Sequence, residues 1–404
     1  MSTTTVSPGN DTAPDAALIA ARDHALAESG WGQGFRLVQP RNPSFWVFLL
    51  GVVAGVATVV QIASQAAALY PVAVAAGVLA FTLYGVVWWV FLRLHDRSVP
   101  RPVSLVATAF VWGGTAGTFW MAVHANDALL SLYGKLFGTA WSTAWGAAFA
   151  APVIEEFAKA TALVLLLGLA AHLVRSPYDG FVIGAFAGLG FQVAEDMLYT
   201  AQTSAVNFGS EQLHSAIETI LLRGALGVVS HTLFSALFCA GLVWFLGRPR
   251  AERNRALGAG LMLTAMVFHF LWDAADAIGN SVFGSTAFAA LVMGVVIVVA
   301  LVLVRVVAHR ASRVPRGWLR DVLAPEVEQG VVTAAEVDAV VGDRGARRRH
   351  LRGAAHGRRR ARHLLEAVRG LAAVIAAGQD VETARAEVER VRGSETPDSV
   401  SSPA

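Results

Sequence analysis

Charged residues are scarce in this sequence. Only 15% of its 404 residues are Asp, Glu, Lys or Arg, whereas 55% are hydrophobic and the mean hydropathy is +0.53. A water-soluble domain of this length needs a more polar surface, so the composition excludes a soluble globular protein and indicates one that folds in lipid. Cysteine is nearly absent as well. The single Cys239 excludes an intramolecular disulfide and a cysteine-rich metal site.

The alternation of apolar and polar residues that marks membrane β-strands is also missing. Apolar stretches recur instead, each of roughly 20 residues, the length at which a helix crosses a hydrocarbon core of about 30 Å. Because lipid offers the backbone no hydrogen bonds, these stretches must be helical. The sequence therefore predicts an all-α, polytopic transmembrane bundle within residues 44–307. About eight spans are expected, at residues 45–66, 70–92, 103–124, 151–173, 179–201, 224–246, 257–278 and 284–307.

Arginine is concentrated in every second connection between these spans. Basic residues precede the first span and follow the second, fourth, sixth and eighth, whereas residues 64–71, 202–213 and 279–285 contain no Lys or Arg. Since basic connections remain on the cytoplasmic side, both termini are predicted to be cytoplasmic. Arg223, at the start of the sixth predicted span, is an exception on the outer side.

Residues 127–150 do not fit this alternation easily. The stretch is apolar, but Lys135 interrupts it and it is rich in Gly, Ser and Trp. We expect a re-entrant or interfacial helix on the outer side. The alternative, an additional span, would break the order of the basic connections.

The two ends of the chain differ in composition from the middle. Residues 1–43 are rich in Ser, Thr, Ala and Pro and lack a basic segment followed by an apolar one, which predicts a disordered cytoplasmic tail rather than a cleaved signal. Residues 308–404 are predicted to form a cytoplasmic, Arg-rich helical tail. Thr333 and Glu336 make a candidate capping box there, and residues 381–391 are amphipathic.

The arginines of this C-terminal tail have two interpretations. They could contact anionic lipid headgroups, at about 1 kcal/mol per basic residue near the surface, or they could form a solvated helix face or a topology anchor. No motif supports nucleic-acid binding, so no nucleic acid is expected. The cluster consists of Arg347, Arg348, Arg349, Arg352, Arg358, Arg359, Arg360 and Arg362.

Ionisable residues inside the spans are few but grouped. Each costs about 2.5 to 3.5 kcal/mol to insert, so each needs a partner or a function. Helical spacing lets Lys159 pair with one of two glutamates and lets Asp273 orient His269. The residues lie on four successive spans: Glu155, Glu156 and Lys159 on the fourth, Glu195 on the fifth, His231 on the sixth, and His269 and Asp273 on the seventh.

These side chains are predicted to share one depth. In the expected topology Glu155, Glu195, His231 and His269 lie within one or two helical turns of each other, all in the outer half of the bilayer. Small residues on the fifth span, at positions 184, 187 and 188, would allow close approach to neighbouring helices. The pattern predicts one polar site inside the bundle.

The order of these motifs resembles the PrsW family of intramembrane proteases. The resemblance rests on Glu-Glu-x-x-Lys at 155–159, Phe-x-x-x-Glu-Asp at 191–196, the isolated His231 and His-x-x-x-Asp at 269–273. The more distant type II CAAX prenyl proteases have Arg after the paired Glu, and His where this chain has Glu195. The resemblance implies cleavage of a membrane-tethered protein, such as an anti-sigma factor cut on its extracytoplasmic side, in a bacterial plasma membrane.

Amide hydrolysis needs an activated water and a stabilised oxyanion. With the resemblance in view, Glu155 or Glu156 is the expected general base. His231, His269 and Glu195 could bind Zn²⁺ with an open position for water, or could position water and oxyanion without a metal. Three alternatives stay open: a proton-coupled transporter or permease, which also uses intramembrane Glu and His, a CAAX-type prenyl endopeptidase, and a catalytically inactive scaffold.

Overall fold

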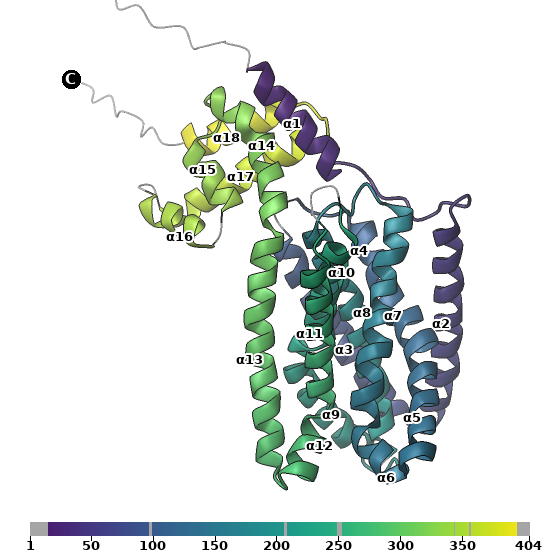
Figure 1. Ribbon diagram of the computed structural model, residues 1–404. Helices are drawn as coiled ribbons and strands as arrows, with labels where there is room; N and C mark the ends of the chain where they lie inside the picture. The colour runs from purple at the N-terminus through teal and green to yellow at the C-terminus, as the bar shows by residue number, and fades with distance from the viewer. Residues whose placement is uncertain are drawn as a thin grey trace, which may run out of the picture. The chain divides into compact units, whose positions relative to one another are not determined.

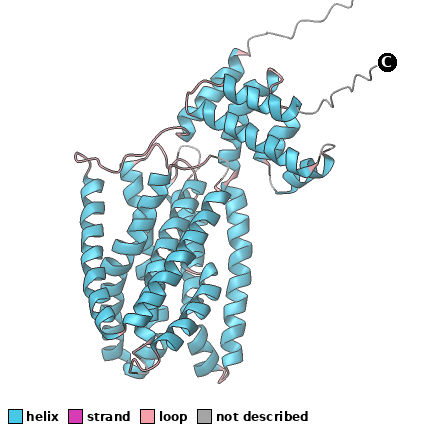
Figure 2. Ribbon diagram, turned by 180° about the vertical axis from the view of Figure 1, so that it is seen from behind, coloured by secondary structure: helices cyan, strands magenta, loops and turns pink. Residues whose placement is uncertain are grey.

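A computed structural model describes residues 15–96, 99–205, 208–248, 253–342, 344–354 and 357–393. Its described part is helical and contains no β-strand (Figure 2). The chain divides into two compact units. The membrane unit comprises Phe35–Arg97 and Arg101–Ser312, and the terminal unit comprises Met1–Gly34, Ser98–Pro100 and Arg313–Ala404. The all-α prediction is confirmed.

The membrane unit is a bundle of long helices (Figure 1). They are separated by short turns or by segments of π or 3₁₀ helix. The elements are α2 (Pro43–Leu69), α3 (Pro71–His95), α4 (Val103–Trp112), η1 (Gly113–Ala122), α5 (Val123–Phe137), α6 (Thr139–Trp141), η2 (Ser142–Gly146), α7 (Ala147–Leu169), α8 (Pro177–Thr203), α9 (Gln212–Leu226), η3 (Gly227–Val229), α10 (His231–Leu246), α11 (Arg255–Asp273), α12 (Ala275–Ala277), η4 (Ile278–Val282) and α13 (Thr286–Ala311).

Seven helical stretches among the described residues are long and apolar enough to cross a membrane. The fourth predicted span, at 151–173, is not among them; it corresponds to α7, which has 23 residues but carries three ionisable side chains. Those side chains are buried inside the unit. Protein partners therefore offset the free-energy cost of placing these ionisable groups inside the membrane. The seven stretches are Pro43–Leu69, Pro71–His95, Val103–Phe137, Pro177–Thr203, Gln212–Leu246, Arg255–Asp273 and Thr286–Glu328.

The structure does not contain a separate re-entrant or interfacial helix at 127–150, nor an additional span there. Its first part, α5, continues α4 and η1 as one helical stretch, Val103–Phe137. A turn follows at Gly138, whose φ of 89° favours glycine, and the remaining residues lead through η2 into α7. The polar residues of this stretch therefore extend two spans instead of forming a new element.

Helix α8 lies at the centre of the membrane unit, packed against α3, α4, α7 and α10. Glycine makes the contact with α10 close. A Cβ on Gly184 would lie 2.2 Å from the Ser235 carbonyl oxygen, and one on Gly188 would lie 2.3 Å from that of His231. The predicted close approach of the fifth span is confirmed, and it fixes the position of His231 against α8.

The predicted sixth span is interrupted. Helix α9 ends at Leu226, a short 3₁₀ turn follows, and Ser230 leaves helical geometry with φ −108° and ψ −118° before α10 begins at His231. The break separates Arg223 on α9 from His231 on α10. Two separate helices thus present these side chains, and α9 itself packs against α3 and α8.

The terminal unit joins the two ends of the chain around its own core. It contains α1 (Ala16–Ser29), α14 (Arg313–Glu328), α15 (Ala334–Val341), α16 (Arg344–Gly353), α17 (Arg358–Ala376) and α18 (Glu382–Gly393). Trp318, Leu365 and Leu371 are among its buried residues. Helix α1 packs against α14, so a disordered tail through residue 43 is wrong for residues 16–29. Residues 1–14 lie outside the described part.

Helix signals in the C-terminal tail are confirmed. Thr333 and Glu336 form the capping box of α15, and the amphipathic run at 381–391 becomes α18. Ion pairs attach α18 to the rest of the unit. Arg385 bonds both carboxylate oxygens of Glu326 at 2.8 and 2.9 Å, and Arg392 lies 2.7 Å from Glu336.

Candidate active site

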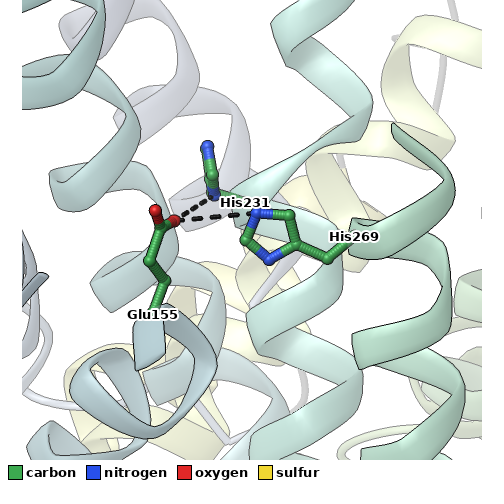
Figure 3. A group of neighbouring side chains, drawn as sticks. All are labelled: Glu155, His231 and His269. Atoms are coloured by element: carbon green, nitrogen blue, oxygen red, sulfur yellow. Dashed lines mark ion pairs between the residues drawn. The ribbon is translucent and has the colours of Figure 1, made fainter. Parts of the chain in front are cut away.

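Three buried side chains from three helices converge inside the membrane unit: Glu155 on α7, His231 on α10 and His269 on α11 (Figure 3). One ligand atom from each lies within 4.8 Å of the other two. Glu155 Oε2 is 3.7 Å from His231 Nδ1 and 3.6 Å from His269 Nε2. The imidazole rings are 5.0 Å apart and nearly perpendicular. Residues 114 positions apart thus meet through the tertiary fold.

A second carboxylate holds each imidazole by its other nitrogen. His231 Nε2 bonds Glu195 Oε2 at 2.9 Å, and His269 Nδ1 bonds Glu156 Oε1 at 3.1 Å. A carboxylate accepts, so each of these nitrogens carries the proton and donates it. In neutral imidazoles the nitrogens facing Glu155 are then unprotonated. This is the arrangement in which carboxylates orient metal-binding histidines.

The paired glutamates of α7 have different surroundings. Lys159 Nζ lies 2.7 Å from Glu156 Oε1 but 3.7 Å from Glu155 Oε2. Ser235 donates to the second oxygen of Glu156 at 3.0 Å. Glu155 Oε2, by contrast, is buried without a hydrogen-bond partner. As helical spacing predicts, Lys159 pairs closely with one of the two glutamates, Glu156, and an oxygen of the other, Glu155, stays without a hydrogen bond.

Lys159 also contacts His231. Its ammonium group donates to His231 Nδ1 at 2.9 Å and lies 4.5 Å from the centre of the Phe191 ring. The lysine is completely buried. Its positive charge therefore belongs to the site, beside the nitrogen of His231 that faces Glu155.

Arg223 is a site residue that the sequence did not identify. From α9 it donates to Glu195 Oε2 at 2.6 Å and also pairs with Asp196. Its guanidinium lies 4.0 Å from the centre of the Tyr199 ring. A signal existed, since Arg223 was the basic residue that broke the charge alternation. Asp196, the residue after Glu195, is fully buried against this arginine.

Asn126 is the second residue missed. It lies on α5 and donates from Nδ2 to Glu155 Oε1 at 2.9 Å. Asn126 follows the third predicted span by two residues and is not ionisable, so the sequence carries no signal for it. A cavity of about 290 Å³ is lined by both polar and apolar residues at this point. The polar ones include Asn126, Glu155, Glu195, Arg223, His231, His269 and Asp273.

Comparison with known families agrees with this geometry. The family model described as PrsW family intramembrane metalloprotease matches residues 101–305, just over half of the chain. The chain belongs to the PrsW family. It is therefore an integral, multi-pass membrane peptidase, and the matched region contains every helix that contributes to the site. No curated protein and no solved structure matches the chain.

The residues of this PrsW-family protease fit a bound cation. The unpartnered Glu155 Oε2 faces two imidazole nitrogens that lack protons when the rings are neutral, which places electron-rich atoms together without a donor for Oε2. Carboxyl groups also outnumber basic side chains around the cavity. Lys159 and Arg223 contact Glu155, Glu156, Glu195 and Asp196, and Asp273 adds a further carboxyl beside His269. A divalent cation would offset this excess.

The structure brings together all seven residues predicted for the site of this PrsW-family protease. Two of their contacts differ from the expected ones. Glu195, expected to be the carboxylate ligand, instead contacts the nitrogen of His231 that points away from Glu155. Asp273 lies 3.5 Å from His269 Nε2, so Glu156 makes the shorter contact that orients this imidazole. Glu156 and Lys159 lie behind the cavity rather than among its lining residues.

Proposed function

We propose that this protease hydrolyses a peptide bond of a membrane-tethered protein at the Glu155, His231 and His269 group, with Zn²⁺ as its metal. The supporting observation is the buried, unpartnered oxygen of Glu155 between two oriented imidazoles. Two histidines and one glutamate are a common catalytic zinc set, in which the fourth position stays open for water or substrate. Zinc at this position would polarise the scissile carbonyl and lower the pKa of a bound water.

The surrounding side chains each have a defined task in this proposal. Glu156 and Glu195 hold His269 and His231 by the nitrogen that points away from Glu155. Lys159 compensates the charge of Glu156, and metal binding at His231 Nδ1 would compete with the Lys159 hydrogen bond there. Arg223 keeps Glu195 in place. These contacts restrict the imidazoles before the substrate arrives, which lowers the cost of organising the transition state.

We assign proton transfer from the attacking water to Asp273. It lines the cavity, and its contact with His269 at 3.5 Å is longer than a hydrogen bond. Glu195 also lines the cavity, but Arg223 and His231 already share one of its oxygens. Glu156 is engaged on both oxygens. The expected general base, Glu155 or Glu156, is thus replaced in this proposal by a carboxylate on α11.

The substrate class follows from the position of the site. A cavity between spanning helices reaches a peptide segment that enters from the membrane, so a single-span protein such as an anti-sigma factor is the proposed substrate. With both termini cytoplasmic, the site lies in the outer half of a bacterial plasma membrane, where a substrate would be cut on its extracytoplasmic side. The site residues are near the ends of α8 and α11 and the start of α10.

The deciding experiment combines proteolysis with metal analysis in reconstituted vesicles. A panel of tagged single-span proteins is incubated with the wild type, Glu155→Gln and His269→Ala, and zinc content is measured on the same samples. We expect cleavage and one bound zinc for the wild type, and loss of both in each variant. His214→Ala, which removes an exposed histidine on α9, should behave like the wild type. Cleavage that survives Glu155→Gln without zinc would contradict the proposed site.

The Arg-rich part of the terminal unit has a separate proposed partner, an anionic lipid headgroup. A surface cavity of about 710 Å³ is lined by Arg358, Arg359, Arg360 and His363 of α17, together with Arg390 of α18. Arg390 is already paired with Glu387 at 2.7 Å, so the test below substitutes Arg358 and Arg359. Titration of the full chain in neutral detergent with short-chain phosphatidylserine should show saturable binding. Binding that is unchanged in an Arg358→Ala, Arg359→Ala double variant would remove this partner.

A further inference from the structure

Asn126 makes one contact on which the geometry of Glu155 depends. The Glu155 carboxylate has two oxygens that could exchange by rotation about its last bond. Asn126 Nδ2 donates to Oε1 at 2.9 Å, which leaves Oε2 as the oxygen 3.6 to 3.7 Å from the two imidazole nitrogens. Lys159, at 3.7 Å from Oε2, is too far for a hydrogen bond. The donor that sets the plane of this carboxylate is therefore Asn126.

The oxygen of the Asn126 amide also bears on the role of this side chain. Asn126 Oδ1 is buried and has no hydrogen-bond partner, although the residue lines the cavity. An unsatisfied buried acceptor costs about 1 to 3 kcal/mol. An amide at this cost does not serve packing alone. Its orientation is explained by the bond to Glu155.

A π-helical segment before α5 sets the direction in which the Asn126 side chain points. The ten residues of η1, immediately before α5, follow a π-helical pattern, and Thr118 also donates its hydroxyl to the Gly113 carbonyl five residues earlier, at 2.7 Å. A π segment widens each turn relative to an α-helix and so rotates all following side chains about the axis. The segment is buried against α7 and α8. Asn126, four residues beyond it, consequently faces α7 and Glu155.

We propose that Asn126 is a positioning residue of the metal centre, acting by holding Glu155 Oε1 so that Oε2 is presented to the metal. The proposal rests on the proposed function, because it requires Glu155 to be a ligand. Groups that hydrogen-bond a ligating carboxylate typically contribute 10-fold to 100-fold in metal affinity or activity. Loss of the Asn126 amide should therefore weaken metal binding by about this factor.

The test measures metal affinity rather than activity. Full-length wild type, Asn126→Leu and Asn126→Ala are purified in detergent, and zinc binding is measured by competition with a chelator. We expect both variants to bind zinc about 10-fold to 100-fold more weakly than the wild type. Co²⁺ in place of zinc should show a changed visible spectrum, because the Glu155 oxygen is no longer fixed. His124→Ala, an exposed position two residues earlier on α5, is the matched control and should retain the affinity and the spectrum.

Each outcome separates this inference from the function on which it rests. If the wild type binds no zinc, or if binding survives His231→Ala, the metal centre itself is wrong. If the wild type binds zinc through His231 while folded Asn126→Leu and Asn126→Ala bind it equally tightly with the same Co²⁺ spectrum, the positioning role is overturned. Thermal unfolding of each apo variant is measured beside the titration. A lower melting temperature with unaltered affinity also overturns the proposal, since it shows a packing role.

Discussion

At the scale of single residues, two adjacent glutamates on one helix have different hydrogen-bonding surroundings. Glu155 and Glu156 are neighbours in sequence, yet one has an unpartnered oxygen at a cavity and the other is bonded on both oxygens by Lys159, His269 and Ser235. A helical step of about 100° turns the two carboxylates to different sides. Glu155 faces the cavity between α5, α10 and α11, and Glu156 faces packed protein.

This difference predicts two distinct phenotypes for the same substitution. Glu156→Gln removes the closest countercharge of the buried Lys159, and leaving a buried charge without its partner costs on the order of 3 kcal/mol. We expect a clearly lowered melting temperature of the purified protein. Glu155→Gln should abolish zinc binding but leave the melting temperature of the metal-free protein unchanged or raised, because its free oxygen has no donor to lose. Equal destabilisation by both changes would contradict these assignments.

At the scale of elements, the site depends on how closely α8 approaches α10. Gly188 lies opposite the backbone of His231, where an added Cβ would be 2.3 Å from the carbonyl oxygen. Real side-chain contacts are never this short, so the helices would have to separate. His231 is the first residue of α10, and it would move with that helix away from Glu195 on α8.

Gly188→Ala should therefore reduce both stability and zinc affinity. Overpacking of this kind typically costs about 1 to 3 kcal/mol, and the displaced His231 should weaken the metal site beyond the effect on folding. Gly260→Ala on α11 is the matched control, because nothing lies within 4 Å of its added Cβ. Alanine there should stabilise the helix by up to about 1 kcal/mol. Thermal unfolding and zinc titration of both variants check the prediction, and a Gly188→Ala protein with wild-type affinity would contradict it.

At the scale of the whole molecule, the two ends of the chain fold together while the middle forms the membrane unit. Helix α1 packs against α14, Ala25 is buried in the core of the terminal unit, and Trp318 donates to Glu28 at 3.3 Å. About 290 residues separate this last pair in sequence. The C-terminal helices alone would expose the apolar face that α1 covers, so the N-terminal segment completes their core.

Removal of residues 1–34 should make the C-terminal helices sensitive to protease. The exposed face of α14 destabilises the terminal unit, so limited trypsin digestion of the full-length protein in detergent should cut residues 313–393 faster in the shortened chain. A chain lacking only residues 1–14 retains α1 and is the control. Equal digestion of the two shortened chains would show that α1 does not stabilise the unit.

Membrane orientation is also a property of the whole chain, and the basic connections predict it. The start of α13 should face outward and its end should face the cytoplasm. A membrane-impermeant maleimide applied to intact cells should label Thr286→Cys, and it should label Arg310→Cys only after the cells are opened. The wild type is a suitable blank, since its single cysteine, Cys239, is buried. The reverse labelling pattern would place both termini outside.

The sequence by itself determined the class of the fold and predicted seven residues that the structure brings together. Apolar stretches specify spanning helices because lipid leaves the backbone no other hydrogen-bonding partners. Ionisable residues inside such stretches stand out because each is costly to bury. These two effects act locally, so they can be recognised along the chain. They single out Glu155, Glu195, His231 and His269, and the order of the motifs around these residues resembles the family that the comparison then showed.

Only the tertiary structure decided which atoms face each other. Helical spacing left open whether Lys159 pairs with Glu155 or Glu156, and it gave no reason to connect Asn126 or Arg223 with the site. The π-helical segment before α5, the break before α10 and the glycine contact of α8 set the rotation and separation of the helices. Rotation and separation depend on packing between segments remote in sequence, and they determine which carboxylate oxygen stays free to bind a metal.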